Sequence, residues 1–175
     1  MDKDFFVEEL QTHHAMLYRV AYTILQNDDA CCDALQDAAL KAWEKRHTLR
    51  ETRYFRTWVT RILINACYDT RRRHRRIVVM EEIPEQSVPP EDPGLAMALE
   101  QLPERLRLPL VLHYAEGMSY AEIADALRLT PWSLKAIWPL PPYKTRPSPD
   151  VRSYSAEAPE RCPSFRLLQL RYSPL

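Results

Sequence analysis

Residues 55–76, FRTWVTRILINACYDTRRRHRR, decide the fold of this 175-residue chain. Apolar side chains recur in this stretch at steps of three and four residues, which is the spacing of one face of an α-helix. These side chains are Phe55, Trp58, Val59, Ile62, Leu63 and Ala66. A helix over about residues 53–76 with such a stripe needs other helices to cover it, so the stretch predicts a helical core.

Two further helices are predicted upstream of this stretch. Apolar residues between Phe6 and Ile24 follow helical spacing and predict one amphipathic helix over residues 3–25. Asn27, Asp28 and Asp29 supply a turn and an N-cap, and an alanine-rich helix is predicted over residues 30–46. The chain has only 2 glycines, which argues against sheet folds whose tight turns need positive φ. The predicted fold class is all-α.

A second, smaller helical domain is predicted after a linker. Residues 77–94 combine prolines with acidic residues, as solvated linkers do. Short helices are predicted over 95–101, 103–115 and 119–127, with a capping box from Ser119 to Glu122 and a new helix start at Thr130-Pro131. Helix, turn and helix in this order indicate a helix-turn-helix. The predicted division is therefore 1–76, a linker at 77–94, a domain at 95–138 and a tail at 139–175.

The net charge of zero hides strongly charged blocks. Residues 1–40 carry 2 basic and 8 acidic side chains, whereas residues 41–76 carry 12 basic and 3 acidic ones. Residues 77–130 are acidic again, with 3 basic and 10 acidic side chains. A compact basic block between acidic ones predicts a localised site for a polyanion.

The basic block places its polar residues on one helical face. Arg61, Asn65, Tyr68 and Arg72, then Arg75 or Arg76, follow steps of three or four residues opposite the apolar stripe. Such a face offers arginines for phosphates, an amide for base edges and a ring for stacking, so we favour nucleic-acid binding. The alternative is a solvated helix end whose arginine cluster only complements the helix dipole.

No pattern for catalysis, a metal or a cofactor is found, and we expect neither an enzyme nor a cofactor. The four cysteines form no C-x-x-C pair of the kind that holds zinc. The acidic, amphipathic start of the chain does not resemble a signal peptide or a membrane span, so a cytoplasmic protein is expected. On the second helix Asp33, Gln36 and Asp37 form one acidic edge, which by spacing alone is ordinary surface charge.

Two stretches resemble the extracytoplasmic-function (ECF) group of bacterial sigma factors. Residues 18–73, above all Asp33-Ala34-Leu35-Gln36-Asp37 and residues 55–69, resemble region two of that family. Residues 99–105 and 117–124 (LEQLPER and GMSYAEIA) resemble its region four. The resemblance implies a non-catalytic sigma factor whose partners are core RNA polymerase, promoter DNA and an anti-sigma factor, without insertion into a membrane.

The resemblance also implies roles for individual residues. The residues that match the segment docking on the clamp helices of the largest polymerase subunit are Asp33, Leu35, Gln36 and Asp37. Melting and reading of the minus-ten promoter element falls to Trp58, Arg61, Asn65, Tyr68, Arg71, Arg72, Arg73, Arg75 and Arg76. Reading of the minus-thirty-five element by the helix-turn-helix falls to Ser119, Tyr120, Thr130, Ser133 and Lys135.

The chain departs from the family pattern after Thr130. Members continue into a long basic recognition helix, whereas here the helix is expected to end at Pro139, within two turns. Residues 131–175 contain nine of the 15 prolines, and we expect mostly disorder there. A reading frame lost near residue 131 is our hypothesis for this change, and translation of the other two frames would test it. We expect impaired recognition of the minus-thirty-five element. Arg128 also stands at a turn position that suits glycine.

Two alternative functions stay open. One is a stand-alone helix-turn-helix regulator that binds an operator as a dimer, which needs an intact recognition helix and a dimer face. The other is an interaction protein that titrates polymerase or an anti-sigma factor without starting transcription. Initiation at a promoter without an upstream element separates a sigma factor from the second alternative.

Overall fold

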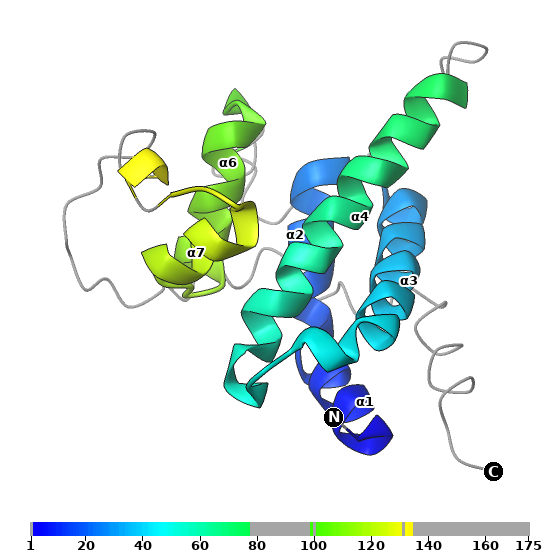
Figure 1. Cartoon of the computed structure of the whole chain (residues 1–175). Coiled ribbons are helices and arrows are strands. Elements are labelled where there is room, and N and C mark those ends of the chain that lie inside the picture. The colour runs from blue at the N-terminus through cyan, green and yellow to red at the C-terminus, as the bar shows by residue number, and fades with distance from the viewer. Residues whose placement is uncertain (1, 78–98, 100, 131, 135–175) are drawn as a thin grey trace.

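The computed structural model describes residues 2–77, 99, 101–130 and 132–134, and within these ranges the chain is helical without a strand (Figure 1). The first half consists of α1 (Lys3–Thr12), α2 (His14–Leu25), α3 (Asp28–Glu44) and α4 (Phe55–Ile77), with short 3-10 turns η1 (Arg46–Thr48) and η2 (Thr52–Tyr54) between the last two. The second half contains α6 (Glu104–Leu110), the π-helical turn η3 (Val111–Ala115) and α7 (Tyr120–Leu127). The all-α fold class is confirmed. No helix in the described ranges is both long enough and apolar enough to cross a bilayer.

The single helix predicted over residues 3–25 is wrong, because the chain breaks at His13. The backbone of His13 leaves the helical region, and α1 ends there while α2 begins at the next residue. The break turns Phe6 and Leu10 of α1 toward the same core as Leu17 of α2. The His13 ring stacks on Phe55 at a centroid distance of 6.2 Å. The apolar faces of two short helices, α1 and α2, therefore pack into the core around α4.

The N-terminus of α3 confirms the predicted cap. The side chain of Asn27 accepts a hydrogen bond from the backbone N–H of Ala30 at 2.7 Å, which satisfies one of the free donors of the first turn. The inner face of α3 is lined with small residues, and Ala34, Ala38 and Ala42 are buried. Small side chains let α3 approach α4 closely, and these two helices form the main packing of the first half.

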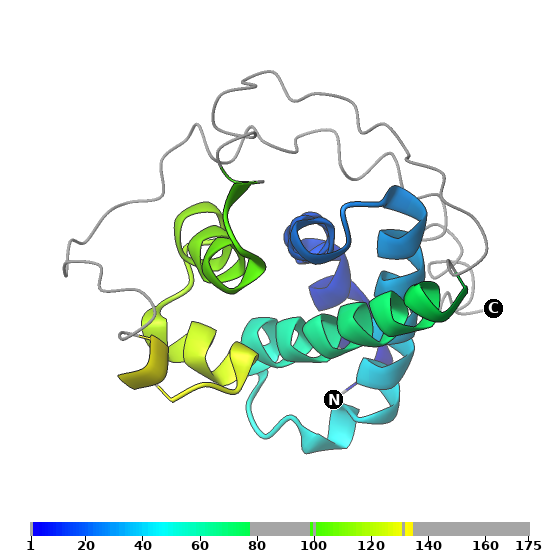
Figure 2. The same ribbon diagram turned by 90° about the horizontal axis from the view of Figure 1, so that it is seen from above.

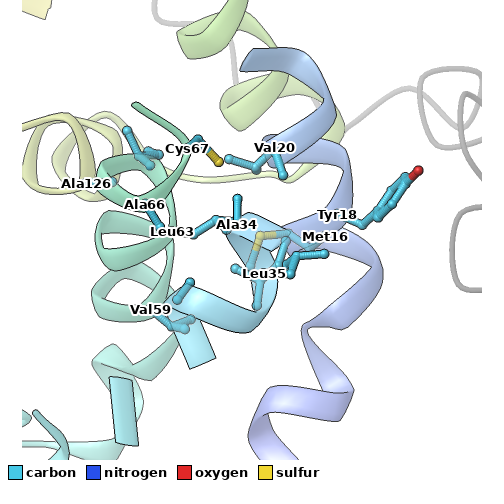
Figure 3. Packing of buried hydrophobic residues seen from close by; sticks show 14 of the residues in the cluster. Met16, Tyr18, Val20, Ala34, Leu35, Val59, Leu63, Ala66, Cys67 and Ala126 are labelled. Atoms are coloured by element: carbon cyan, nitrogen blue, oxygen red, sulfur yellow. The ribbon is translucent and has the colours of Figure 1, made fainter. Parts of the chain in front are cut away.

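The predicted apolar stripe of α4 forms the centre of the core. Phe55, Val59 and Leu63 have less than 2% of their surface exposed. Figure 3 shows Val59, Leu63 and Ala66 of α4 in one cluster with Leu35 of α3 and Met16 of α2. Two buried polar side chains of α4 have hydrogen-bond partners nearby. The Thr60 hydroxyl donates to the carbonyl oxygen of Arg56 at 2.8 Å. Trp58 donates its indole N–H to the hydroxyl of Thr48 at 3.2 Å and so fixes η1 against the core.

The predicted break at Gly117 and the predicted caps at Ser119 and Thr130 are confirmed, whereas the helix predicted over 103–115 is not one regular α-helix. Pro109 stands inside α6, where it has no N–H to donate, and the helix widens directly after it into η3. Gly117 follows with a φ of 65°, and Ser119 and Glu122 form the capping box that starts α7. Arg128 ends α7 in the left-handed region with a φ of 54°. Thr130 then accepts a hydrogen bond from the backbone N–H of Ser133 at 3.1 Å, as expected of an N-cap.

The two halves of the chain pack against each other. Figures 1 and 2 show α6 beside α2 and α7 beside α4, and these pairs, together with η3 against α2, make the main contacts between the halves. Leu112, Ile123 and Ala126 of the second half belong to the same cluster of buried residues as Leu63 of α4. The division into domains at 76/77 and 94/95 stays a prediction. The predicted linker after residue 77 and the tail at 139–175 lie outside the described residues.

Candidate polymerase and nucleic-acid interfaces

The acidic edge predicted on α3 contains three polar residues at the surface and one core residue. Asp33 is exposed, and Gln36 and Asp37 are half-buried beside it on the same side of the helix. Leu35 is only 4% exposed and belongs to the core. The structure therefore brings Asp33, Gln36 and Asp37 together as a surface and assigns Leu35 a packing position.

Ion pairs join this edge to α4. Asp37 accepts a hydrogen bond from Arg73 at 2.6 Å, and this contact raises the pKa of the arginine. Asp69, one turn before Arg73 on α4, contacts Lys41 of α3 at 3.3 Å. Asp69 also accepts a hydrogen bond from Arg72, which is the main cause of its lowered pKa. The predicted docking edge and the predicted DNA-reading helix are thus neighbours where α3 packs against α4.

The polar face of α4 divides into two strips of different exposure. The open strip contains Asn65 and Arg72, which are exposed to solvent. Asn65 donates its side-chain amide to the carbonyl oxygen of Arg61 at 2.7 Å. Arg72 is 72% exposed and contacts Asp69 of its own helix. A phosphate or a base edge has free access to this open strip.

The covered strip contains Thr57, Arg61, Tyr68 and Arg71, and acidic residues of the second half lie on it. Arg61 contacts Asp125 of α7 at 3.1 Å, and Arg71 pairs with Glu104 of α6. The Arg71 guanidinium also lies over the Tyr68 ring, at 5.0 Å from its centroid. Burial and then the negative charge of Glu104 raise the pKa of Tyr68 to about 12. The side chain predicted to stack on a base is therefore half-buried against the second half.

Trp58 lies in the core, and its predicted role in DNA contact stays a prediction. Its side chain is 6% exposed and packs against Phe55, with ring centroids 5.8 Å apart. Trp58 belongs to the apolar stripe as well as to the stretch that resembles region two, and in this structure its ring packs as part of the stripe. Arg75 and Arg76 belong to α4, but their side chains lie outside the described part of the chain.

The predicted helix-turn-helix residues serve mainly as caps and packing groups. The Ser119 hydroxyl accepts a hydrogen bond from the Glu122 N–H at 3.3 Å, and Tyr120 is half-buried beside His113, with ring centroids 5.2 Å apart. Thr130 and Ser133 hydrogen-bond each other through their hydroxyls at 2.7 Å. Lys135 lies outside the described residues. In the ranges that the structure describes, no three His, Cys, Asp or Glu side chains meet as a metal site.

Residues that no sequence pattern indicates connect the two halves. Arg19 of α2 holds the carboxylate of Glu116 with two hydrogen bonds of 2.5 and 2.8 Å. Arg56 of α4 donates to the carbonyl oxygen of the same residue at 2.9 Å. Arg19 and Glu116 are 97 positions apart, so no local spacing could reveal the pair. Arg56 lies in the basic block at 41–76 and Glu116 in the acidic block at 77–130, whereas Arg19 lies outside both blocks.

Comparison with protein families identifies both halves. Residues 10–77 match the family described as Sigma-70 region 2, and residues 94–135 match Sigma-70, region 4. The solved structure of the sigma factor RpoE in complex with the anti-sigma factor NepR from Bartonella quintana has a similar fold. Its TM-score is 0.67 at 24% identity, and the match covers 79% of this chain and 91% of that one.

Curated relatives carry the same family name. ECF RNA polymerase sigma factor SigL of Mycobacterium tuberculosis is 30% identical over 136 residues, which cover 71% of this chain and 77% of SigL. SigE of Mycolicibacterium smegmatis, also an ECF sigma factor, is 33% identical, with 69% of this chain matching 52% of SigE. RNA polymerase sigma factor SigV of Bacillus subtilis is 26% identical, with 70% and 78% covered. The chain therefore belongs to the ECF group of sigma-70 family RNA polymerase sigma factors.

Proposed function

We propose that this chain binds core RNA polymerase through the acidic edge of α3 and directs it to promoters through the polar face of α4. The observation that carries this proposal is the contact between the two surfaces. Asp37 on the docking edge and Arg73 on the DNA-reading helix are 2.6 Å apart. Polymerase docked on α3 therefore lies directly beside DNA held on α4.

The residues of α4 suit a promoter that is being opened. Arg71, Arg72 and Arg73 supply positive charge for phosphates, Asn65 can bond a base edge, and Tyr68 can stack on an unpaired base. Unpaired bases lose their stacking and pairing partners when the duplex opens, so a protein that opens it needs polar and aromatic side chains to hold them. We leave Trp58 and Leu35 out of the contact surface, since both are buried in the core.

The second half has a smaller role in this proposal. Its helix-turn-helix would read the upstream promoter element, and we expect this reading to be impaired because the chain after Thr130 departs from the family pattern. We further propose an anti-sigma factor as a regulatory partner, as RpoE of Bartonella quintana has in NepR. The chain itself performs no reaction in this scheme, and it acts in the cytoplasm, where the polymerase and the chromosome are.

Reconstitution with core RNA polymerase tests the proposal. The purified chain is mixed with core enzyme from its own bacterium, and transcription is measured from a template with a preformed bubble. We expect binding and transcripts, and we expect weaker core binding for the Asp33→Ala/Asp37→Ala variant. The matched control is Asp4→Ala/Glu8→Ala, which removes the same charge from exposed positions of α1. Equal binding by both variants would contradict the docking surface.

The same experiment separates the alternatives. Binding without any transcript from the bubble template would favour an interaction protein that only titrates polymerase. Tight, sequence-specific DNA binding without polymerase would favour a stand-alone regulator. Circular dichroism of each sample shows whether a lost function reflects a lost fold.

A further inference from the structure

We propose that Trp132 selects thymine in the upstream promoter element. The inference rests on the proposed function, which gives the reading of that element to the helix-turn-helix. It deepens the proposed function by naming a base and the side chain that reads it. Trp132 is not among the residues for which the resemblance to sigma factors implies contact with this element.

Hydrogen bonds fix the helical turn that carries Trp132. Thr130 accepts a hydrogen bond from the backbone N–H of Ser133 at 3.1 Å, and the two hydroxyls lie 2.7 Å apart. The backbone N–H of Leu134 donates to the carbonyl oxygen of Thr130 at 3.1 Å. Residues 132–134 therefore begin the second helix of the helix-turn-helix. The match to Sigma-70, region 4 extends to residue 135 and includes this turn.

The Trp132 side chain points away from the protein. Leu134 is fully buried and belongs to the core. Two positions on a helix of 3.6 residues per turn are about 200° apart around the axis, so Trp132 lies on the opposite face. Trp132 is 79% exposed, the higher value of the two exposed large apolar residues in the described ranges. Figures 1 and 2 show this turn after α7, on the side of the second half remote from α4.

The position of Trp132 matters more than its exposure, because single apolar residues are common on protein surfaces. In a helix-turn-helix, the first residues of the second helix contact base edges in the major groove. Thr130 and Ser133 of this turn hydrogen-bond each other, whereas the indole of Trp132 is open to solvent. An indole ring has few rotatable bonds and loses little conformational entropy when it is bound. Trp132 is therefore the large side chain that this turn presents to DNA.

The chemistry of the indole distinguishes the four bases. It has an apolar ring surface and one N–H donor, and it accepts no hydrogen bond. In the major groove thymine presents a methyl group beside the O4 acceptor. Guanine presents two acceptors without a methyl group, while adenine and cytosine each present an amino donor. Thymine is thus the base whose edge matches both parts of the indole, and an amino donor facing the ring loses its hydrogen bond to water.

Transcription from a promoter library tests the inference. Core RNA polymerase from the same bacterium, reconstituted with the full chain, transcribes duplex templates whose upstream region is randomised and marked by a transcribed barcode. We expect sequencing of the transcripts to show an enriched thymine with the natural chain and no such enrichment with Trp132→Ala. Trp132→Phe keeps an aromatic ring against the methyl group and should keep the enrichment.

Tyr54→Ala is the matched control for loss of an exposed aromatic ring. Tyr54 is 50% exposed and lies in the first half of the chain, in η2. Its replacement should leave the upstream thymine enriched. A general effect of lost aromatic surface would change both variants alike.

Replacement of the enriched thymine by deoxyuridine then tests the contact itself, because deoxyuridine lacks only the methyl group. We expect polymerase with the natural chain to bind this promoter about fourfold more weakly, which is the effect of one buried carbon. Polymerase with Trp132→Ala should bind the two promoters equally. Electrophoretic mobility shift at fixed salt measures both affinities.

The outcomes separate this inference from the proposed function. If no upstream thymine is enriched, or if Trp132→Ala keeps the enrichment, the inference is wrong. The proposed function then stands as long as the bubble template, which needs no upstream element, is transcribed. If Trp132→Ala weakens the binding of core polymerase itself, the ring contacts polymerase and the inference is also wrong. If the natural chain gives no transcript from the bubble template, the proposed function fails and the inference with it. Circular dichroism confirms that each variant is folded.

Discussion

The carboxylate of Asp37 on α3 accepts a hydrogen bond from the guanidinium of Arg73 on α4 at 2.6 Å. The Asp37 side chain has 35% of its surface exposed and the Arg73 side chain 56%. Exposed pairs of this kind contribute at most about 1 kcal/mol to stability. The pair has a greater consequence for function. Asp37 of the proposed polymerase surface binds the guanidinium of Arg73, which belongs to the proposed DNA surface.

Release of Arg73 should therefore increase DNA binding. Asp37→Asn removes the acceptor charge, and Asp33→Asn removes the same charge from a nearby position of α3. Because Asp37 hydrogen-bonds Arg73 whereas no such bond joins Asp33 to it, we expect the free chain to gain about two- to fivefold in affinity for single-stranded DNA with Asp37→Asn, and less with Asp33→Asn. Fluorescence anisotropy at fixed salt measures the difference. Equal gains would mean that only net charge matters.

Arg72 should contribute one phosphate contact in the complex of polymerase with promoter DNA. In the free chain it contacts only Asp69 among the described residues, so its loss leaves the fold intact. We expect Arg72→Ala to weaken promoter binding and to reduce the slope of log affinity against log salt by about one. Lys3→Ala on α1 is the control and should leave the slope unchanged. An unchanged slope for Arg72→Ala would remove this residue from the DNA surface.

Trp58 should affect stability rather than recognition. Trp58→Phe keeps a ring in the core but loses the hydrogen bond to Thr48, and we expect the free energy of unfolding to fall by about 1–2 kcal/mol. Urea titration followed by circular dichroism measures this change. DNA affinity of the folded protein, measured in the complex with polymerase, should be unchanged. Weaker DNA binding at full stability would restore the role in DNA contact that the sequence predicts.

His14 should make the fold sensitive to mild acid. Burial in α2 lowers the pKa of His14 below its ordinary value of 6.5, so the unfolded chain binds the proton more readily than the folded one. Stability is therefore fully present above pH 6.5 and decreases as the pH falls below it. We expect a lower unfolding temperature at pH 5.5 than at pH 7.5, and a smaller difference in His14→Gln. His47→Gln changes an exposed histidine and should keep the wild-type difference.

Arg128 should be replaceable by glycine with a gain in stability. Its φ of 54° lies in the left-handed region, which a side chain with a Cβ enters at a cost. We expect Arg128→Gly to raise the free energy of unfolding by up to about 1 kcal/mol, the glycine entropy included. Arg107→Gly, inside helix α6, should lower it instead. Thermal unfolding of the two variants checks both directions.

Local signals predicted most of the helices correctly. The stripe from Phe55 to Ala66 predicted α4, Asn27 predicted the start of α3, and Ser119 with Glu122 predicted α7. Each of these signals depends on residues close together in sequence. Because the helical backbone has a regular repeat, their spacing alone fixes how they lie relative to one another. The break at His13 was missed because apolar spacing continues across it, and only packing against Phe55 and the core distinguishes two helices from one.

The sequence by itself determined the helical class, the caps, the basic block and the resemblance to sigma factors, since these follow from neighbours along the chain. Tertiary structure decided which of those residues are accessible. Leu35 and Trp58 are buried, Asp37 is paired with Arg73, and the strip of α4 from Thr57 to Arg71 is covered. The physical reason is that burial and ion pairing depend on what a distant part of the chain places opposite a residue, as Glu116 does for Arg19.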